Sequence, residues 1–146
     1  MAYVEIGILY DQFQMTDDYD KEFFSSESQK AYEIDSLKME LTKVEKLYGM
    51  ATANDKPALQ NQYDALFLKI KELDGIYQNS NQMLKQQMNT EIFNKINEYM
   101  KEYGEEKGYS IIWGANGNGN IMYGEEGKNI TEDVLKYINE KYENEK

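Results

Sequence analysis

IDSLKMELTKVEKLY (residues 34–48) and LQNQYDALFLKIKEL (residues 59–73) each place an apolar side chain at every third or fourth position. This spacing keeps one stripe of a helix turned toward a partner. If the chain folds back between the two stretches, the stripes pair from Tyr48 with Leu59 to Ile34 with Leu73. Pro57 suits the first turn of a helix and prevents the preceding helix from continuing. The two stretches therefore predict an antiparallel helical hairpin with its tip near residues 50–57.

The predicted hairpin covers residues 16–103. Thr16 is a plausible N-cap, with acidic residues in the following turn where the helix dipole favours them. The second helix begins near residue 56 and extends its stripe past its partner to Tyr103, and we expect Gly104 and Gly108 to end it. Residues 8–15 are expected to form a short helical or irregular connector before the hairpin.

Short strands are predicted on both sides of the hairpin. Residues 3–6 alternate as in a half-buried strand, and residues 109–113 form a second candidate strand. Two Asn-Gly pairs follow within residues 116–119, and they predict a β-hairpin whose return strand is 120–123. Thr131 is the expected N-cap of a last helix.

The sequence therefore predicts an α+β fold with two parts. Residues 1–15 and 104–146 form a small β-containing body with a C-terminal helix, and residues 16–103 form a long projecting hairpin. The hairpin has a single narrow seam, which buries little apolar surface in one copy. Open strand edges in the body also invite pairing with another chain. We therefore expect oligomerisation through the body, with Val4, Ile6, Ile111, Ile112, Ile121 and Tyr123 as candidates for its core or for the interface.

Composition excludes several functions. The 146 residues contain no Cys and no His, which removes thiol chemistry, the usual zinc ligand sets and histidine acid–base catalysis. No catalytic carboxylate arrangement is apparent, so we expect neither an enzyme nor a bound cofactor or metal. The net charge of −11 argues against a nucleic-acid partner, which would favour a basic surface.

A second set of apolar residues lies off the hairpin seam and is the candidate binding surface. Opposite pairing would place Met39 against Leu68 along one flank, with further apolar residues near the tip. Met and Tyr suit contact with many partners, because Met is flexible and Tyr combines an apolar ring with a hydroxyl. Alternatively, these side chains pack against a neighbouring hairpin or widen the seam. The set comprises Tyr32, Met39, Leu47, Met50, Phe67, Leu68 and Ile76.

Short segments at both ends of the chain form one further pattern together with the long hairpin. They are Ala2-Tyr3-Val4, Leu9 to Phe13, Gly108-Tyr109-Ser110-Ile111-Ile112, Gly114-Ala115-Asn116, Ile121-Met122-Tyr123 and Asn129-Ile130-Thr131-Glu132-Asp133-Val134-Leu135. In these residues and in the order of its parts, the chain resembles the Skp/OmpH family of periplasmic chaperones from one end to the other. The most specific part of the resemblance is C-terminal, whereas helical stripes recur in many unrelated proteins.

The resemblance implies a homotrimer, with strands that join in a central body and three hairpins, or tentacles, around a cavity. It implies an ATP-independent holdase that prevents unfolded outer-membrane proteins from aggregating. It also implies a periplasmic location, with a leader removed ahead of Met1. Without the resemblance, the absence of a visible leader would fit a cytoplasmic protein equally well.

The sequence departs from the family in its charge. The best-known members are basic, whereas this chain is acidic and carries eight lysines against eight acids between Lys30 and Lys85. The acidic balance argues against direct binding to lipopolysaccharide or anionic lipid. The alternative function is a structural or adaptor coiled-coil protein that docks one folded partner. A holdase would bind several unrelated unfolded barrels, whereas an adaptor would bind none.

Overall fold

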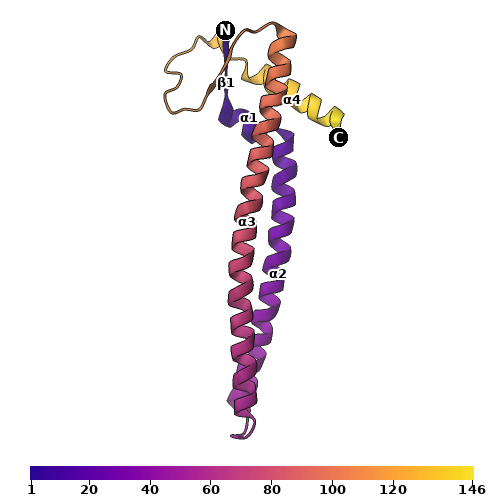
Figure 1. Cartoon of the computed structure of the whole chain (residues 1–146), viewed down its shortest axis with the longest axis vertical. Coiled ribbons are helices and arrows are strands. Elements are labelled where there is room, and N and C mark those ends of the chain that lie inside the picture. The colour runs from indigo at the N-terminus through magenta and orange to yellow at the C-terminus, as the bar shows by residue number, and fades with distance from the viewer. The chain divides into compact units, whose positions relative to one another are not determined.

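The computed structural model describes residues 1–146. The chain divides into two compact units, which we call the sheet unit (Met1–Lys21 and Gln86–Lys146) and the hairpin unit (Glu22–Lys85). Figure 1 labels the main elements along the chain. In chain order they are β1 (Ala2–Glu5), α1 (Ile6–Gln12), α2 (Gln14–Met50), α3 (Lys56–Lys107), β2 (Ile112–Ala115), the 3-10 helix η1 (Glu126–Lys128) and α4 (Thr131–Glu145). The predicted α+β class, dominated by two long helices, is confirmed.

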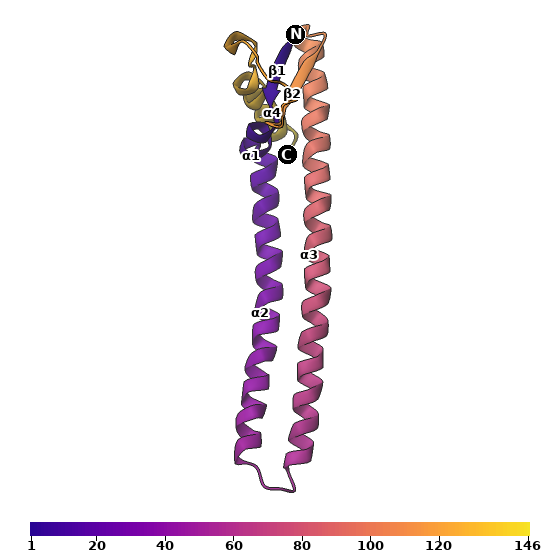
Figure 2. The same ribbon diagram turned by 90° about the vertical axis from the view of Figure 1, so that its left-hand side faces the viewer.

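The hairpin unit is formed by α2 and α3, which lie side by side and run in opposite directions (Figures 1 and 2). Its facing side chains are those of the predicted seam. Ile34 and Val44 are the only buried residues of the unit, at 8% and 5% exposure. The other seam residues are half-buried, except Tyr48 at the loop end, which is 38% exposed. The predicted hairpin is therefore correct, and one hairpin unit alone buries very little.

Residues 51–55 make the turn between the two long helices. The Thr52 carbonyl accepts hydrogen bonds from the backbone N–H groups of Asp55 and Lys56, at 3.1 and 3.2 Å. The Thr52 hydroxyl lies 3.0 Å from a carboxylate oxygen of Asp55. Pro57 lies in the first turn of α3, where the helix does not need its missing N–H. The turn is thus closed by local polar groups, which leaves the apolar side chains of the helices for other contacts.

The sheet unit contains a two-stranded parallel sheet. β1 pairs with β2, with Tyr3 opposite Trp113 and Val4 opposite Gly114. On its other side, the Tyr3 carbonyl accepts a 3.0 Å hydrogen bond from the backbone N–H of Ile130. Strands from opposite ends of the sequence therefore meet, as the fold prediction required.

The predicted β-hairpin is wrong. Residues 120–123 form no strand, and β2 pairs with β1 instead. The Asn120 side chain accepts a hydrogen bond from the Asn116 N–H at 3.1 Å and donates one to the Gly114 carbonyl, so a side chain occupies the position of a return strand. The physical reason is burial: an isolated two-stranded hairpin is marginal in water, whereas β1 brings Ala2 and Val4 into the core.

The core of the sheet unit joins residues from both ends of the chain. Its members come from β1, α1, the start of α2, the end of α3 and α4: Ala2, Val4, Leu9, Phe13, Met15, Ile92, Ile96, Tyr99, Tyr103, Ile130, Val134 and Ile138. Phe13 separates α1 from α2 with an extended backbone (φ −73°, ψ 128°). Its fully buried ring packs edge-on against Tyr99 and Tyr142, at centroid distances of 6.3 and 5.4 Å. This break in the helix is therefore held by aromatic packing.

Both predicted N-caps are corrected. α2 begins at Gln14, so Thr16 lies inside its first turn with a buried hydroxyl that has no hydrogen-bond partner. α4 begins at Thr131 itself, after an N-cap at Ile130. The Thr131 hydroxyl instead accepts a 2.9 Å hydrogen bond from the Glu5 N–H and ties the end of β1 to α4. In both cases tertiary packing decides where the helix begins.

α3 ends at Lys107, four residues beyond the predicted end at Tyr103, and Gly108 is the one of the two expected glycines that follows it. Gly108 has φ +75°, and the following N–H, that of Tyr109, bonds the Gly104 carbonyl at 2.9 Å. This is the Schellman arrangement, which favours glycine because other residues are strained at positive φ. Gly104 lies within the last turn and is buried.

Gly75→Ala is expected to stabilise the protein by about 1 kcal/mol, because glycine inside a helix loses more backbone freedom on folding than alanine. A Cβ at Gly75 would meet no atom within 4 Å. Urea unfolding followed by circular dichroism would measure the change. The matched substitution Gly108→Ala should destabilise the protein, because the φ of +75° at residue 108 strains any residue with a side chain. A Gly75→Ala variant that is less stable than the parent would contradict this account.

Candidate interaction surfaces

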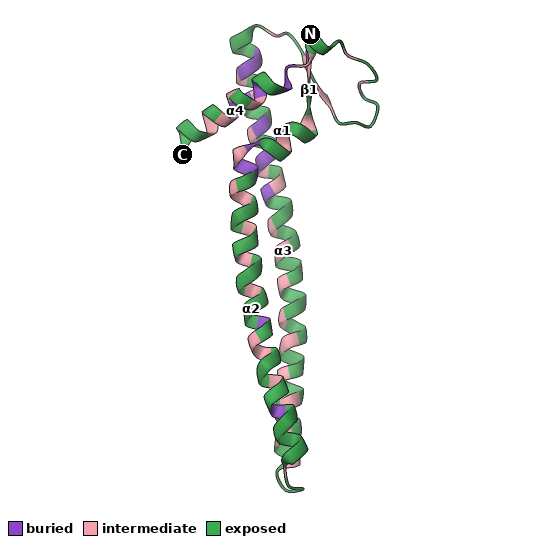
Figure 3. Cartoon of the chain, turned by 180° about the vertical axis from the view of Figure 1, so that it is seen from behind, coloured by how far each residue is buried: buried purple, intermediate pink, exposed green.

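All seven candidate binding residues of the hairpin unit are exposed. Figure 3 shows the unit as mostly exposed, with the less exposed residues between its helices. The exposed fractions run from 50% for Phe67 to 79% for Met50, and the others are Ile76 52%, Leu47 52%, Leu68 64%, Met39 66% and Tyr32 76%. None of them widens the seam within one chain. Two of the predicted roles remain for these seven side chains: contact with a client protein, or contact with a neighbouring hairpin.

Met39 and Leu68, which the sequence pairs along one flank, can be placed relative to the seam by their spacing. Met39 lies two positions from the seam residues Leu37 and Leu41, and two positions is just over half a turn of helix. Leu68 has the same relation to Leu66 and Ile70. Met39 therefore points away from α3, and Leu68 points away from α2. The helical spacing therefore places the two side chains on opposite outer faces of the hairpin.

Two further exposed apolar residues of the hairpin unit were not predicted from the sequence. Phe24 is 69% exposed and Met83 is 70% exposed. A signal was present, because the exposed residues of α2 recur in steps of eight, seven and eight from Phe24 through Tyr32, Met39 and Leu47. On α3 the corresponding residues Leu68, Ile76 and Met83 recur in steps of eight and seven.

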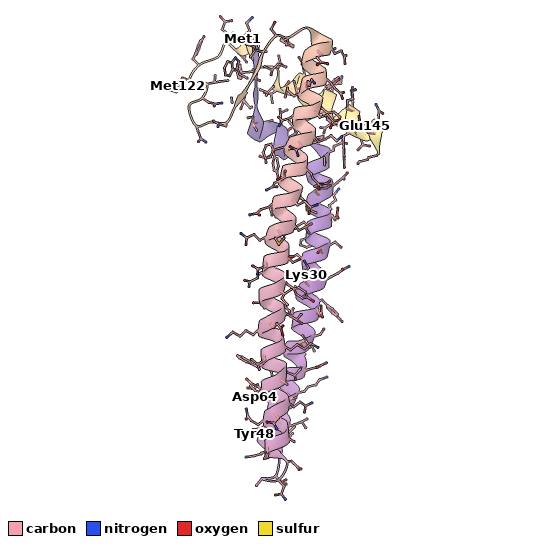
Figure 4. The ribbon with its side chains drawn as sticks, in the orientation of Figure 1. Met1, Lys30, Tyr48, Asp64, Met122 and Glu145 are labelled. Atoms are coloured by element: carbon pink, nitrogen blue, oxygen red, sulfur yellow. The ribbon has the colours of Figure 1, made fainter.

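A polar section interrupts the seam on the side away from the tip. The half-buried Lys30 (labelled in Figure 4) donates hydrogen bonds from Nζ to Ser80 Oγ at 3.0 Å and to Asn81 Oδ1 at 2.7 Å. Its Nζ also lies 5.8 Å from the centre of the Tyr77 ring, and the Tyr77 hydroxyl donates to Glu33. These partners compensate the ammonium group, so α2 and α3 are joined here by polar contacts instead of apolar burial.

The six candidates for the body divide by burial. Val4 is 3% exposed and belongs to the core, whereas Ile6, Ile112 and Ile121 are half-buried. Ile111 and Tyr123 are 46% and 85% exposed. Within one chain, therefore, only Val4 has the burial expected of a core residue, and the other candidates retain apolar surface for a further partner.

A shallow apolar hollow lies among these residues. Its volume is about 680 Å³, and its lining includes Met1, Tyr3, Trp113, Ile121, Met122 and Tyr123. Met122, which Figure 4 labels on the loop after β2, is 89% exposed, Met1 is 74% exposed and Trp113 is 50% exposed. These three residues were not among the surface residues predicted from the sequence. Large exposed apolar patches on soluble proteins commonly mark interaction sites.

Charge is unevenly shared between the two units. The sheet unit holds 8 lysines and 17 acidic residues, a net charge of −9, whereas the hairpin unit holds 8 lysines and 10 acidic residues, a net charge of −2. The exposed apolar side chains of the hairpin unit are therefore set in a nearly neutral surface. Such a surface neither attracts nor repels a charged partner strongly over long range.

Polar side chains of α4 hold the junction between α1 and α2. The Asn139 amide accepts a 2.8 Å hydrogen bond from the Gln14 N–H and donates one of 3.2 Å to the Gln12 carbonyl. Hydrogen bonds from Lys146 and from the Tyr142 hydroxyl lower the pKa of the Asp18 carboxyl. Burial raises the pKa of the Tyr99 hydroxyl, which also donates a hydrogen bond to Glu145. This network is structural, because it joins helices of the sheet unit to one another.

The structure contains no group of three or more acidic side chains placed to hold a metal ion. No helix is both long and apolar enough to cross a membrane.

The long helical hairpin defines a coiled-coil protein, and its outer surface carries exposed apolar side chains. The family model described as "Outer membrane protein (OmpH-like)" matches residues 1–138, and the chain belongs to this OmpH-like family. Members of the family are periplasmic chaperones of outer-membrane proteins rather than enzymes. A search of curated proteins finds no match to the chain.

Proposed function

We propose that this chain is an ATP-independent periplasmic holdase that binds unfolded outer-membrane proteins and prevents their aggregation. Membership of the OmpH-like family supports the general function. The observation that carries the finer proposal is the hairpin unit, where two residues are buried and nine large apolar side chains off the seam are at least 50% exposed. The number of exposed apolar side chains on this narrow unit supports contact with an apolar partner.

In the proposed assembly, three chains associate through a body formed by residues 1–15 and 104–146. The apolar hollow beside Trp113 and Tyr123 supports this, because a second copy could cover it. Residues 16–103 of each chain act as a tentacle with its tip near residues 50–57. The tentacles surround a client and shield its apolar segments from other unfolded chains.

Client contact in this mechanism is multivalent. Single exposed residues such as Met39 offer little affinity, but several tentacles that touch one client raise the effective concentration of each further contact. Met side chains adapt to irregular surfaces, and Tyr side chains combine an apolar ring with a polar tip. Binding through many weak contacts needs no defined client sequence and no ATP.

Light scattering behind size exclusion tests the proposal as a whole. The chain alone should have a mass near that of three chains, and mixing with a urea-unfolded outer-membrane barrel should give a soluble complex with one client. A second, unrelated barrel should behave in the same way. A monomer or dimer that leaves both barrels to aggregate would contradict the holdase and favour an adaptor that docks one folded partner.

Two paired variants should reveal which outer face of the hairpin meets the client. Tyr32→Ser with Met39→Ser removes apolar surface from the face of α2 that points away from α3. Phe67→Ser with Leu68→Ser removes it from α3. If one of these faces is turned toward the client, the double substitution on that face should weaken client binding by about tenfold or more. The reason is that each apolar side chain contributes about 1 kcal/mol of contact.

The control for both pairs is Asn61→Ser with Gln62→Ser, which changes two exposed polar residues of α3. Helicity by circular dichroism should be the same in all three variants, because every changed side chain is exposed. Suppression of barrel aggregation, measured by light scattering, is the readout. If both apolar pairs and the control protect the client equally well, these residues are not the binding surface.

A further inference from the structure

The loop between β2 and η1 contains the two Asn-Gly pairs of the chain, Asn116-Gly117 and Asn118-Gly119. In the structure these four residues lie outside every helix and strand, and all are exposed. Gly117 and Gly119 have positive φ angles of 76° and 84°. The turn that the sequence predicts here forms no β-hairpin, so the loop has no ladder of hydrogen bonds to restrain it.

The two asparagines differ in how their side chains are held. Asn116 Oδ1 accepts a 3.0 Å hydrogen bond from the Asn118 N–H, and the Asn116 N–H donates to Asn120 Oδ1 at 3.1 Å. The Asn118 side chain makes no hydrogen bond. Gly119 lies in no helix or strand, and its N–H donates no hydrogen bond to the backbone. Asn118 therefore combines a free amide, a free neighbouring N–H and a following residue without a side chain.

We propose that Asn118 is a site of spontaneous deamidation, with water as the co-reactant. The backbone nitrogen of Gly119 attacks the side-chain amide carbon of Asn118. A carbon–nitrogen bond forms in a five-membered succinimide, the bond to the side-chain nitrogen breaks, and ammonia leaves with the proton from the Gly119 N–H. One water molecule then opens the ring at either carbonyl and gives aspartate or isoaspartate. No electron transfer takes place.

Glycine after asparagine favours this step because no Cβ hinders the approach of its nitrogen, and its backbone reaches the required angles. Asn120 is not followed by a glycine, because the next residue is the β-branched Ile121. Its side chain also donates a hydrogen bond to the Gly114 carbonyl. Asn116 has a following glycine, but its side-chain oxygen must first leave its hydrogen bond. One hydrogen bond of ordinary strength corresponds to about a fivefold factor, so Asn118 should convert about fivefold faster than Asn116.

The product changes the charge of the loop. Each conversion replaces a neutral amide with a carboxylate on the loop that carries Met122 and Tyr123 and that follows β2. The sheet unit, already at −9, gains a further negative charge. Isoaspartate also lengthens the backbone by one methylene at a position between two turns.

The test holds the full-length protein at mildly alkaline pH and follows peptides by mass spectrometry, with chromatography to separate aspartate from isoaspartate. Asn118 should be the first site converted, faster at alkaline than at mildly acidic pH because the attacking nitrogen must lose its proton. Asn118→Gln should remove the fast conversion, whereas Asn116→Gln should retain it. In urea, where the hydrogen bond of Asn116 is lost, the two sites should convert at similar rates.

Three results would overturn the proposal. The first is no conversion at Asn118 in the folded protein under conditions that convert an unstructured Asn-Gly peptide. The second is faster conversion at Asn116 than at Asn118. The third is a ratio between the two sites that is the same in the folded protein and in urea, because the fold would then have no part in the selection.

Discussion

Replacing Phe13 with alanine is expected to lower the free energy of unfolding by about 3–5 kcal/mol, the range measured for buried aromatic residues. The Phe13 side chain is 0% exposed and contacts the rings of Tyr99 and Tyr142. Alanine would leave a cavity at the point where α1 ends and α2 begins. Urea unfolding at a fixed protein concentration, followed by circular dichroism, measures the loss.

The matched control is Phe24→Ala, the same substitution at a residue that is 69% exposed. Its effect should stay within about 0.5 kcal/mol, as for ordinary surface substitutions. Equal losses for Phe13→Ala and Phe24→Ala would contradict the burial described here. Equal losses would also suggest that Phe24 is covered in the assembled protein, which size exclusion of the Phe24→Ala variant would reveal.

Tyr123→Asp is expected to convert the proposed trimer into single chains. Tyr123 is 85% exposed in the isolated chain and lines the apolar hollow of the sheet unit. If a second copy covers this hollow, the new carboxylate would be buried without a partner, at a cost that exceeds what a small interface contributes. Light scattering should then report the mass of one chain at concentrations where the parent protein shows three.

Tyr32→Asp serves as the control, because Tyr32 is similarly exposed, at 76%, but lies on the hairpin unit. It should leave the mass unchanged and weaken client protection. Tyr123→Asp should keep the folded core, which circular dichroism can check, since Tyr123 is not part of it. A Tyr123→Asp protein that retains the mass of three chains would show that the interface lies elsewhere.

The long helices were predictable because their signal is local and repeated. The seam residues from Ile34 to Leu73 recur with the helical period, and the structure places them between α2 and α3. The start of α3 was also predictable, since Pro57 acts through its own backbone, whereas the helix continues through Gly104 to Lys107, beyond its predicted end at Tyr103. The exposure of residues such as Met39 and Leu68 follows from the same period, because both lie off the seam.

The short elements were less predictable. The Asn-Gly pairs after β2 predict a hairpin, but the competing partner β1 lies more than a hundred residues away in sequence. Likewise, Thr16 and Thr131 have the chemistry of N-caps, and each lies inside the first turn of its helix. Thr131 instead bonds the backbone of Glu5 at the far end of the chain. Local preferences of less than about 2 kcal/mol are readily overridden by such tertiary contacts.

The sequence by itself determined the helical hairpin, its seam and its turn, because each depends on contacts between residues whose spacing is regular. It also determined the chemistry that the protein lacks, since no Cys or His is present. Only the tertiary structure decided the parallel pairing of β1 with β2, the break at Phe13 and the hollow beside Trp113. The reason is that these features join segments distant in the chain, and their stability comes from shared burial that no local pattern records.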